Sequence, residues 1–324
     1  MIDEYALMLR SLEKGFRFRE LRVVNPDPLI VGTERGLKRI RYWEDESLLE
    51  QHLRWRDRLK GGHFFLDRMH VTASGAPLIR FGRLALTCHD APVDQAPLVG
   101  HERLWAQTVG DLLRRSRGAA AADSGSRLEW VERAYEQARQ SGAFTDQSGK
   151  LLVSCYPYAR QRAVLCDRIR SRRGDQTFLL PRDFSWSDCK WIYGLLFIEL
   201  GQLTPRDGYR SLGDFFLYVD LTEGDDCVRR LFRDLHEADV PLAEAVDGLR
   251  LAWQEPSEWM ALAEQCASRQ VAKDQTERFV QRWDNNVRMI RLLESELSDV
   301  VRPEGEVPND GPLFNGDQSY SFSL

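Results

Sequence analysis

The chain has 324 residues, 43% hydrophobic and 29% charged, which is enough for a sizeable core in one large domain or two tightly coupled domains. Its 45 basic and 50 acidic residues give a net charge of −5, which provides no general attraction for nucleic acid or anionic membranes. No apolar run approaches the roughly 18 residues of a membrane span, and the start lacks the basic-then-apolar order of a signal peptide. We therefore expect cytoplasmic synthesis and no membrane span. The six cysteines occur singly, which indicates reduced thiols rather than disulfides or a zinc site.

Residues 1–95 have the pattern of a small strand-rich lobe. Short β-branched and aromatic runs, broken by Asn-Pro, Gly and Ser-Gly, predict antiparallel strands in LRVVNPDPLIVGT, GLKRIRYW, FLDRMHVTASGAPLIRFG and RLALTC. One helix interrupts them, in EDESLLEQHLRWRDRLKGG, where an apolar stripe at helical spacing ends at a Gly pair.

Residues 96–301 are dominated by helical patterns, and strand-like material is found only around TFLLPRDF and WIYGLLFIEL. Residues 302–324 are rich in Pro and Gly, so we expect an extended or mobile tail. The order of elements predicts an α+β protein with a small strand-rich lobe that contains one helix, followed by a larger helical lobe. This is the arrangement of a bilobal protein-kinase-like fold.

Two residues of the small lobe fit a nucleotide site. Lys38 lies on the third expected strand, in a chain with only six lysines, and a kinase-like lobe would direct it to the α- and β-phosphates of ATP. Glu46, in the following helix, is our candidate for the carboxylate that pairs with Lys38, although Glu50, on the same face of the helix, could serve as well. Each has a simpler reading, because edge strands often carry an exposed Lys and helix N-termini favour acidic residues.

Three acids of the second lobe fit the chemistry of phosphate transfer. In LLPRDFSWSDCK, Asp183 and Asp188 have the spacing of a loop in which the first residue accepts the proton of a substrate hydroxyl and the second binds magnesium. Glu199 ends the apolar run in FIELG, where a kinase-like fold places its main magnesium carboxylate. We therefore assign Asp183 as catalytic base and Asp188 and Glu199 as metal ligands.

These features together resemble a known family. The LKRI strand, the TASGAP hairpin, the loop at 179–190, FIELG and the helix RSLGDFFLYV are similar to those of the spore-coat kinase-like (CotS) proteins, within the aminoglycoside phosphotransferase and choline kinase-like superfamily. The resemblance implies a kinase-like fold, ATP and Mg²⁺ as cofactors if the site is functional, spore-coat proteins as partners, and a location in the spore coat.

The sequence departs from this family at the catalytic positions. Family members that look active carry His-Gly-Asp and Asn in the loop, whereas this chain has Pro181, Arg182, Asp183 and Asp188. They carry Asp-Phe-Asp at the metal strand, where this chain has Glu-Leu-Gly at 199–201. Pro has no N–H to fix the loop, and a displaced carboxylate costs roughly 10²-fold in rate per ångström. We therefore predict a degenerate kinase-like protein, a pseudokinase that acts by binding.

Two alternatives stay open. The chain could be an active ATP- and Mg²⁺-dependent phosphotransferase that acts on a hydroxyl of a small molecule or protein. It could also be a helical interaction protein unrelated to kinases. For a binding role, Trp43 and Trp55 with neighbouring arginines are candidates for a partner surface, although burial in the core would explain both tryptophans more simply.

Overall fold

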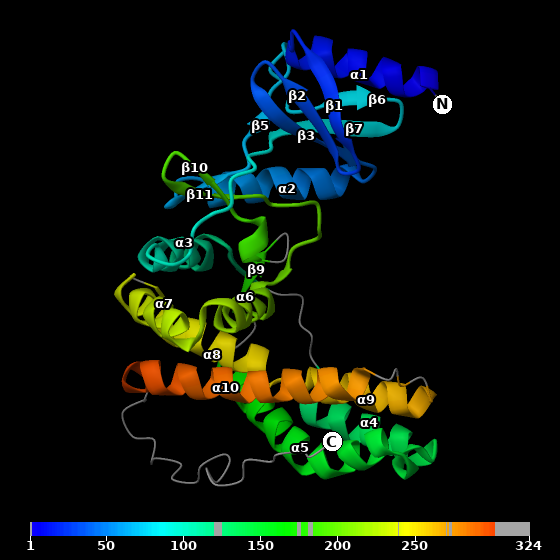
Figure 1. The fold of residues 1–324 in the computed structure, drawn as a ribbon, viewed down its shortest axis with the longest axis vertical. Helices are drawn as coiled ribbons and strands as arrows, with labels where there is room; N and C mark the ends of the chain where they lie inside the picture. Colours follow the sequence, from blue (N-terminus) through cyan, green and yellow to red (C-terminus); the bar gives the residue numbers. More distant parts are fainter. Residues whose placement is uncertain are drawn as a thin grey trace.

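The molecule is elongated, with a strand-rich part at one end and helices at the other (Figure 1). The computed structural model describes residues 2–119, 125–173, 176–180, 184–238, 240–269, 271 and 274–301. The expected α+β organisation is confirmed, because strands gather in the N-terminal region and helices make up most of the C-terminal part. The tail expected at 302–324 lies outside the described residues.

The strand-rich part is built on an antiparallel sheet in the order β1-β2-β3-β7-β5, with β6 paired to β7. Its strands are β1 (Leu21–Pro26), β2 (Leu29–Thr33), β3 (Gly36–Trp43), β5 (Met69–His70), β6 (Ile79–Phe81) and β7 (Leu84–Asp90). Strand β3 pairs with both β2 and β7, so it lies inside the sheet and both of its faces can be covered.

Two helices cover the two faces of this sheet. Helix α1 (Ile2–Phe16) packs Met8 and Leu12 against Ile40 of β3, and helix α2 (Glu46–Leu59) packs Leu49 against Trp43. Helix α2 was predicted, and its N-terminus is capped by the Asp45 carboxylate. The expectation of a single helix in this lobe is wrong, because α1 is a second one. Its buried face repeats every fourth residue, which is the helical spacing.

Two smaller sheets connect the strand-rich part to the helices. One has the order β10-β11-β4 and contains β4 (Phe64–Leu66), β10 (Lys190–Ile192) and β11 (Leu195–Ile198). The other has the order β12-β9-β8 and contains β8 (Arg117–Ala119), β9 (Gln176–Leu180) and β12 (Arg206–Asp207). Strands β4 and β11 are parallel, so a segment of the first lobe and one from the middle of the chain share a sheet.

The helical part contains the remaining helices of the described chain. They are α3 (Glu102–Arg115), α4 (Arg127–Gln140), η1 (Ala143–Thr145), α5 (Gln147–Arg173), η2 (Trp186–Asp188), α6 (Gly208–Glu223), α7 (Asp225–Glu237), α8 (Leu242–Gln254), α9 (Ser257–Ser268) and α10 (Gln275–Val301). The largest hydrophobic cluster runs from Trp55 and Leu59 of α2 through Trp105 to Leu293 of α10. This continuous core couples the two parts, because both bury apolar side chains in it.

The cysteine and membrane predictions can be checked directly. Five of the six cysteines are buried, the environment expected for thiols that pack as small hydrophobic side chains. In the described part of the chain, no helix has the length and apolar character needed to cross a membrane.

Candidate functional site

The two faces of strand β3 carry different charges. Successive side chains on a strand point to opposite faces, and Ile40 packs toward α1 whereas Trp43 packs toward α2. Lys38 therefore lies on the α1 face with Ile40, while Arg39 and Arg41 lie on the α2 face with Trp43. The alternation of side chains along β3 therefore decides which of its basic residues can contact groups on the α2 side of the sheet.

Lys38 is held within the sheet on the α1 face. Its Nζ lies 2.6 Å from Asp90 Oδ1 and donates to the backbone carbonyl of Arg35 at 2.7 Å. His70 Nε2 lies 2.7 Å from the same Asp90 oxygen. Burial raises the pKa of Asp90, but the His70 hydrogen bond and Lys38 outweigh it and lower this pKa to about 2. The lysine thus has an ionised partner of its own.

The ion pair predicted between Lys38 and Glu46 is not formed, so that pairing is wrong. Glu46 lies in the first turn of α2 and pairs with Arg80 of β6, whose Nη2 is 3.2 Å from Glu46 Oε2. Both side chains are more than half exposed. Glu46 acts here as the acidic residue of a helix start, the simpler reading of this position. The role of Lys38 and Glu46 in nucleotide binding stays a prediction.

Two acids meet at the ends of parallel strands β4 and β11. Ile198 pairs with Leu66, and the Asp67 amide donates to the Ile198 carbonyl at 2.9 Å. Asp67 follows β4 and Glu199 follows β11, so both carboxylates emerge at the same edge. Sequence reasoning identified Glu199 but missed Asp67. The signal was present, because FFLD and LFIE each place an acid directly after an apolar run.

Three arginines surround these acids. Arg41 Nη2 lies 3.1 Å from Asp67 Oδ2 and 3.7 Å from Glu199 Oε2. Arg39 Nη1 pairs with Glu199 Oε2, and Arg56 Nη2 of α2 lies 2.7 Å from Asp67 Oδ1. We call this group, with His89 of β7, the arginine cluster; its members are Arg39, Arg41, Arg56, Asp67, His89 and Glu199.

Burial and neighbouring charges determine the protonation states of Asp67 and His89, the buried members of the arginine cluster. Burial would raise the pKa of Asp67, but Arg41, Arg56 and His89 overcome it and lower this pKa, so the carboxylate is ionised. Burial lowers the pKa of His89 to about 4, against the effect of Asp67. His89 is therefore neutral near pH 7.

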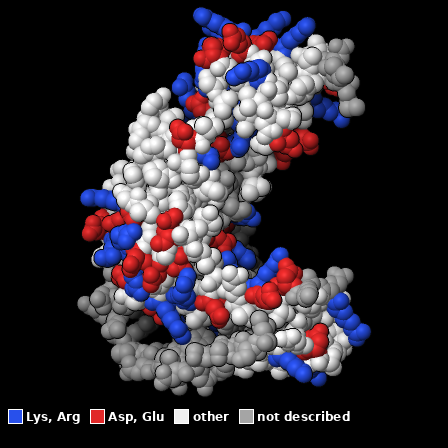
Figure 2. All heavy atoms as spheres, in the orientation of Figure 1, with Lys and Arg blue, Asp and Glu red and all other residues white. Residues whose placement is uncertain are grey.

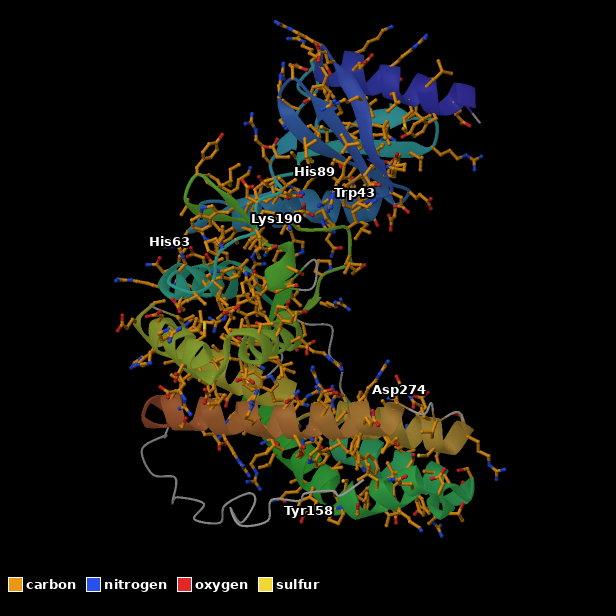
Figure 3. The ribbon with its side chains drawn as sticks, viewed as in Figure 1. Trp43, His63, His89, Tyr158, Lys190 and Asp274 are labelled. Carbon is orange, nitrogen blue, oxygen red and sulfur yellow. The ribbon has the colours of Figure 1, made fainter. Side chains whose placement is uncertain are left out.

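Polar contacts surround both ring nitrogens of this neutral imidazole. His89 Nδ1 lies 3.2 Å from Asp67 Oδ2, and Nε2 lies 2.7 Å from the Thr87 hydroxyl, which also accepts from Trp43 Nε1 at 2.8 Å. Nδ1 also lies 3.3 Å from Arg56 Nη2, so this ring nitrogen is placed between an acid and a base of the arginine cluster. Trp43 and His89 lie on the side of the sheet that faces α2 (Figure 3). Trp43 and Trp55 are buried, so neither forms the exposed surface considered for partners.

The segment after Glu199 is tied to the strand-rich part. Arg41 Nη1 donates to the Gly201 carbonyl at 2.6 Å, and Gln202 Nε2 donates to the Tyr42 carbonyl at 2.7 Å. His52 Nε2 of α2 donates to the Leu203 carbonyl at 2.8 Å. Residues 199–203 are thereby fixed against β3 and α2 by a row of polar contacts that starts at Glu199.

The predicted phosphotransfer loop is described only at its ends. Asp183 lies outside the described residues, and Asp188 ends η2. Phe184 is buried against Trp105 and Phe215, and Trp186 Nε1 donates to the Ala96 carbonyl at 2.8 Å. The flanks of the loop are thus anchored in the core and on the segment that joins the two parts. The roles predicted for Asp183 and Asp188 stay predictions.

The described residues fit magnesium and ATP poorly. No group of three or more His, Cys, Asp or Glu side chains among them could hold a metal ion, and the Glu199 carboxylate is bound by guanidinium groups. The β1–β2 turn contains Pro26 and Pro28, which have no N–H to offer to phosphate oxygens. The metal role predicted for Glu199 stays a prediction, and it conflicts with the arginine contacts.

A separate groove lies on the helical part, between α6, α9 and α10, with a volume of about 510 Å³. Glu258 contributes to its wall with a side chain that is 5% exposed. Its Oε1 binds Arg162 Nη1 at 2.5 Å, while Oε2 has no hydrogen-bond partner among the described residues. Tyr218 and the Arg282–Asp214 ion pair also line it.

The visible surface is hollowed along one side, between the strand-rich end and the end that carries α9 and α10 (Figure 2). Acidic and basic side chains are interspersed over this face. Neither sign dominates it, in keeping with the near balance of charges in the sequence.

By sequence, the chain matches no protein-family model and no curated protein. By structure, it is similar to an aminoglycoside phosphotransferase from Alicyclobacillus acidocaldarius, with a TM-score of 0.62 and 14% identity over 90% of this chain and 95% of that one. An AMP-bound spectinomycin phosphotransferase gives a TM-score of 0.52 and 9% identity, covering 89% and 97% of the two chains. A thermostable mutant of another aminoglycoside phosphotransferase gives 0.50 and 10%, covering 87% and 98%.

These neighbours belong to the aminoglycoside phosphotransferase and choline kinase-like superfamily, and the likeness shows a kinase-like fold. The fold predicted from the sequence is confirmed. The fold expected under the alternative, a helical protein unlike kinases, is wrong, because the likeness to a kinase-like fold extends over nine-tenths of the chain. At these identities the comparison establishes the fold alone.

Proposed function

We propose that this protein is a pseudokinase: it keeps the kinase-like fold, does not transfer phosphate, and acts by binding. The observation that carries the proposal is the engagement of Glu199 by Arg39 and Arg41. A magnesium carboxylate must offer its oxygens to the cation, and a guanidinium that holds the same oxygen competes with it directly. Asp67, the neighbouring acid, is enclosed by Arg41 and Arg56.

Manganese binding tests this proposal without any knowledge of a substrate. Mn²⁺ prefers the same oxygen ligands as Mg²⁺, and the loss of its free electron paramagnetic resonance signal reports binding. We expect no stoichiometric binding at micromolar Mn²⁺ in the wild type. Stoichiometric binding that disappears in Glu199→Gln would overturn the proposal.

The runner-up function is an active phosphotransferase, and the fold neighbours favour it because their names identify them as phosphotransferases. In this reading Asp183 is the base, and ATP and Mg²⁺ are the cofactors. An assay of ATP consumption with Mg²⁺, over candidate hydroxyl acceptors, separates the two. Turnover that is lost in Asp183→Asn establishes the enzyme; no turnover in the wild type agrees with the pseudokinase.

The place of action that we propose is the spore coat, with coat proteins as partners. Support comes from the sequence motifs that resemble the spore-coat kinase-like proteins, such as TASGAP and FIELG. Immunoblotting of purified coat extracts tests this location. A signal confined to the soluble fraction of the sporulating cell would contradict it and would leave the pseudokinase proposal intact.

A further inference from the structure

The arginine cluster carries a surplus of positive charge. Its three arginines contribute three positive charges, its two carboxylates contribute two negative charges, and His89 is neutral. Buried charges in proteins are generally matched by counter-charges, because an unmatched ion loses hydration without an equivalent gain. Within the described residues, one guanidinium of the cluster therefore lacks a counter-charge.

Arg39 is the most exposed arginine of the cluster. Arg41 and Arg56 are enclosed around Asp67, with side chains 4% and 9% exposed, whereas the Arg39 side chain is 29% exposed. Among the described residues Arg39 binds Glu199 through Nη1 alone. Within the described part of the chain its Nε is buried without a hydrogen-bond partner, a state that is costly for a charged donor. Within the described residues, Arg39 thus has N–H donors that Glu199 does not use, and they lie on the side of β3 that faces α2.

We propose that Arg39, backed by Arg41, binds a multiply charged oxyanion, phosphate or diphosphate, without a metal ion. The planar guanidinium has five donors and can hold one acceptor group on each of two edges. In a working phosphotransferase a metal ion links the protein carboxylate to the phosphate. Here Arg39 takes that linking position, with Glu199 on one edge and the oxyanion on the other.

This inference rests on the proposed function, because it requires that Glu199 be engaged by arginine rather than by Mg²⁺. It adds a ligand class to the same site. Because Nε is covered by neighbouring atoms, we expect the anion to engage Nη2 first and to reach Nε after a shift of the side chain. Lys38 does not take part, since it lies on the other face of β3 and is paired with Asp90.

Titration calorimetry in EDTA tests the inference with three probes: inorganic pyrophosphate, ADP and adenosine. We expect pyrophosphate to bind without metal and to weaken as NaCl is added. Tighter binding of ADP than of pyrophosphate would identify a nucleotide as the source of the oxyanion, and equal binding would identify an inorganic or other phosphate. Adenosine alone should not bind at this site.

Two variants locate the binding. Arg39→Gln should weaken pyrophosphate roughly 10- to 100-fold, the value of a charge-assisted hydrogen bond. Arg35→Gln is the matched control, because Arg35 lies in the preceding turn, is 53% exposed and pairs with Glu34 outside the cluster. Its affinity should equal that of the wild type.

No heat of binding in EDTA, equal losses in both variants, or binding that appears only with Mg²⁺ would overturn the inference. The first two results leave the pseudokinase proposal standing, since that proposal concerns Mn²⁺ binding and turnover. Mg²⁺-dependent binding that is lost in Glu199→Gln would contradict both.

Discussion

The two faces of strand β3 both carry charge, but they are built differently. On the α1 face Lys38 and His70 share Asp90, which is 21% exposed, and all three residues belong to one sheet. On the α2 face the arginine cluster surrounds Asp67, which is wholly buried, and joins β3, α2, β7 and the ends of β4 and β11. The first is a local ion pair, whereas the second links segments that are distant in the sequence.

This difference teaches that the face of β3 on which a basic side chain lies decides whether it can reach Asp67 and Glu199. Lys38 fits a nucleotide site by residue type, yet it points away from the acids. Its neighbours Arg39 and Arg41 reach them. A one-residue offset on a strand moves a side chain to the opposite face, so a plausible residue type in the wrong register has no access to the site.

Removing the central acid of each face gives the largest predicted contrast. Asp67→Asn leaves Arg41 and Arg56 buried without a carboxylate and should lower the free energy of unfolding by about 3–5 kcal/mol. Asp90→Asn affects a partly exposed pair and should lower it by about 1 kcal/mol. Urea denaturation at pH 7 measures both.

The two substitutions are equally conservative, so each serves as the control of the other. Equal losses would show that the arginine cluster contributes no more than a local ion pair. A larger loss for Asp90→Asn would reverse the comparison.

The helices and the kinase-like order of the chain could be predicted because they depend on local patterns. Asp45, which caps α2, and the apolar stripe that follows it are adjacent in the sequence. The motif FIELG likewise identified Glu199, because an acid at the end of a buried apolar run is conspicuous.

Asp67 has the same local signal as Glu199, but neither the meeting of these two acids nor the role of Arg41 could be found in this way. Asp67 reaches Glu199 only because β4 pairs in parallel with β11, about 130 residues away in the chain, and no local pattern specifies that pairing. To identify Arg41 from the sequence, one would have to know which face of β3 is turned toward α2. Long-range pairing and register, rather than residue type, set the limit of the sequence prediction.

Acid should weaken the two faces in separate pH ranges. The pKa of His89 is about 4 in the fold against an ordinary 6.5, so the unfolded chain binds the extra proton between these values and stability falls as pH drops from 6.5 to 4. The pKa of Asp90 is about 2 against 3.8; its contribution is complete above 3.8 and is lost as pH falls toward 2.

Urea midpoints of the wild type and of His89→Gln at pH 7, 5.5 and 4.5 test the first range. The wild type should lose stability more steeply than the variant over this interval. Parallel curves would mean that His89 is not held neutral in the fold, and the arginine cluster would then carry a larger positive surplus.

The smallest effect is expected at Glu46. Because Glu46 and Arg80 are largely exposed, Glu46→Gln should leave the urea midpoint of unfolding unchanged within error. It should also leave pyrophosphate binding unchanged, since Glu46 contacts neither Lys38 nor the arginine cluster in the described structure. A loss of pyrophosphate binding in Glu46→Gln would mean that Glu46 reaches the arginine cluster in another conformation and belongs to the binding site. If Glu46→Gln leaves the affinity for pyrophosphate unchanged and Arg39→Gln lowers it, the positive charge that binds the anion lies on the α2 face of β3.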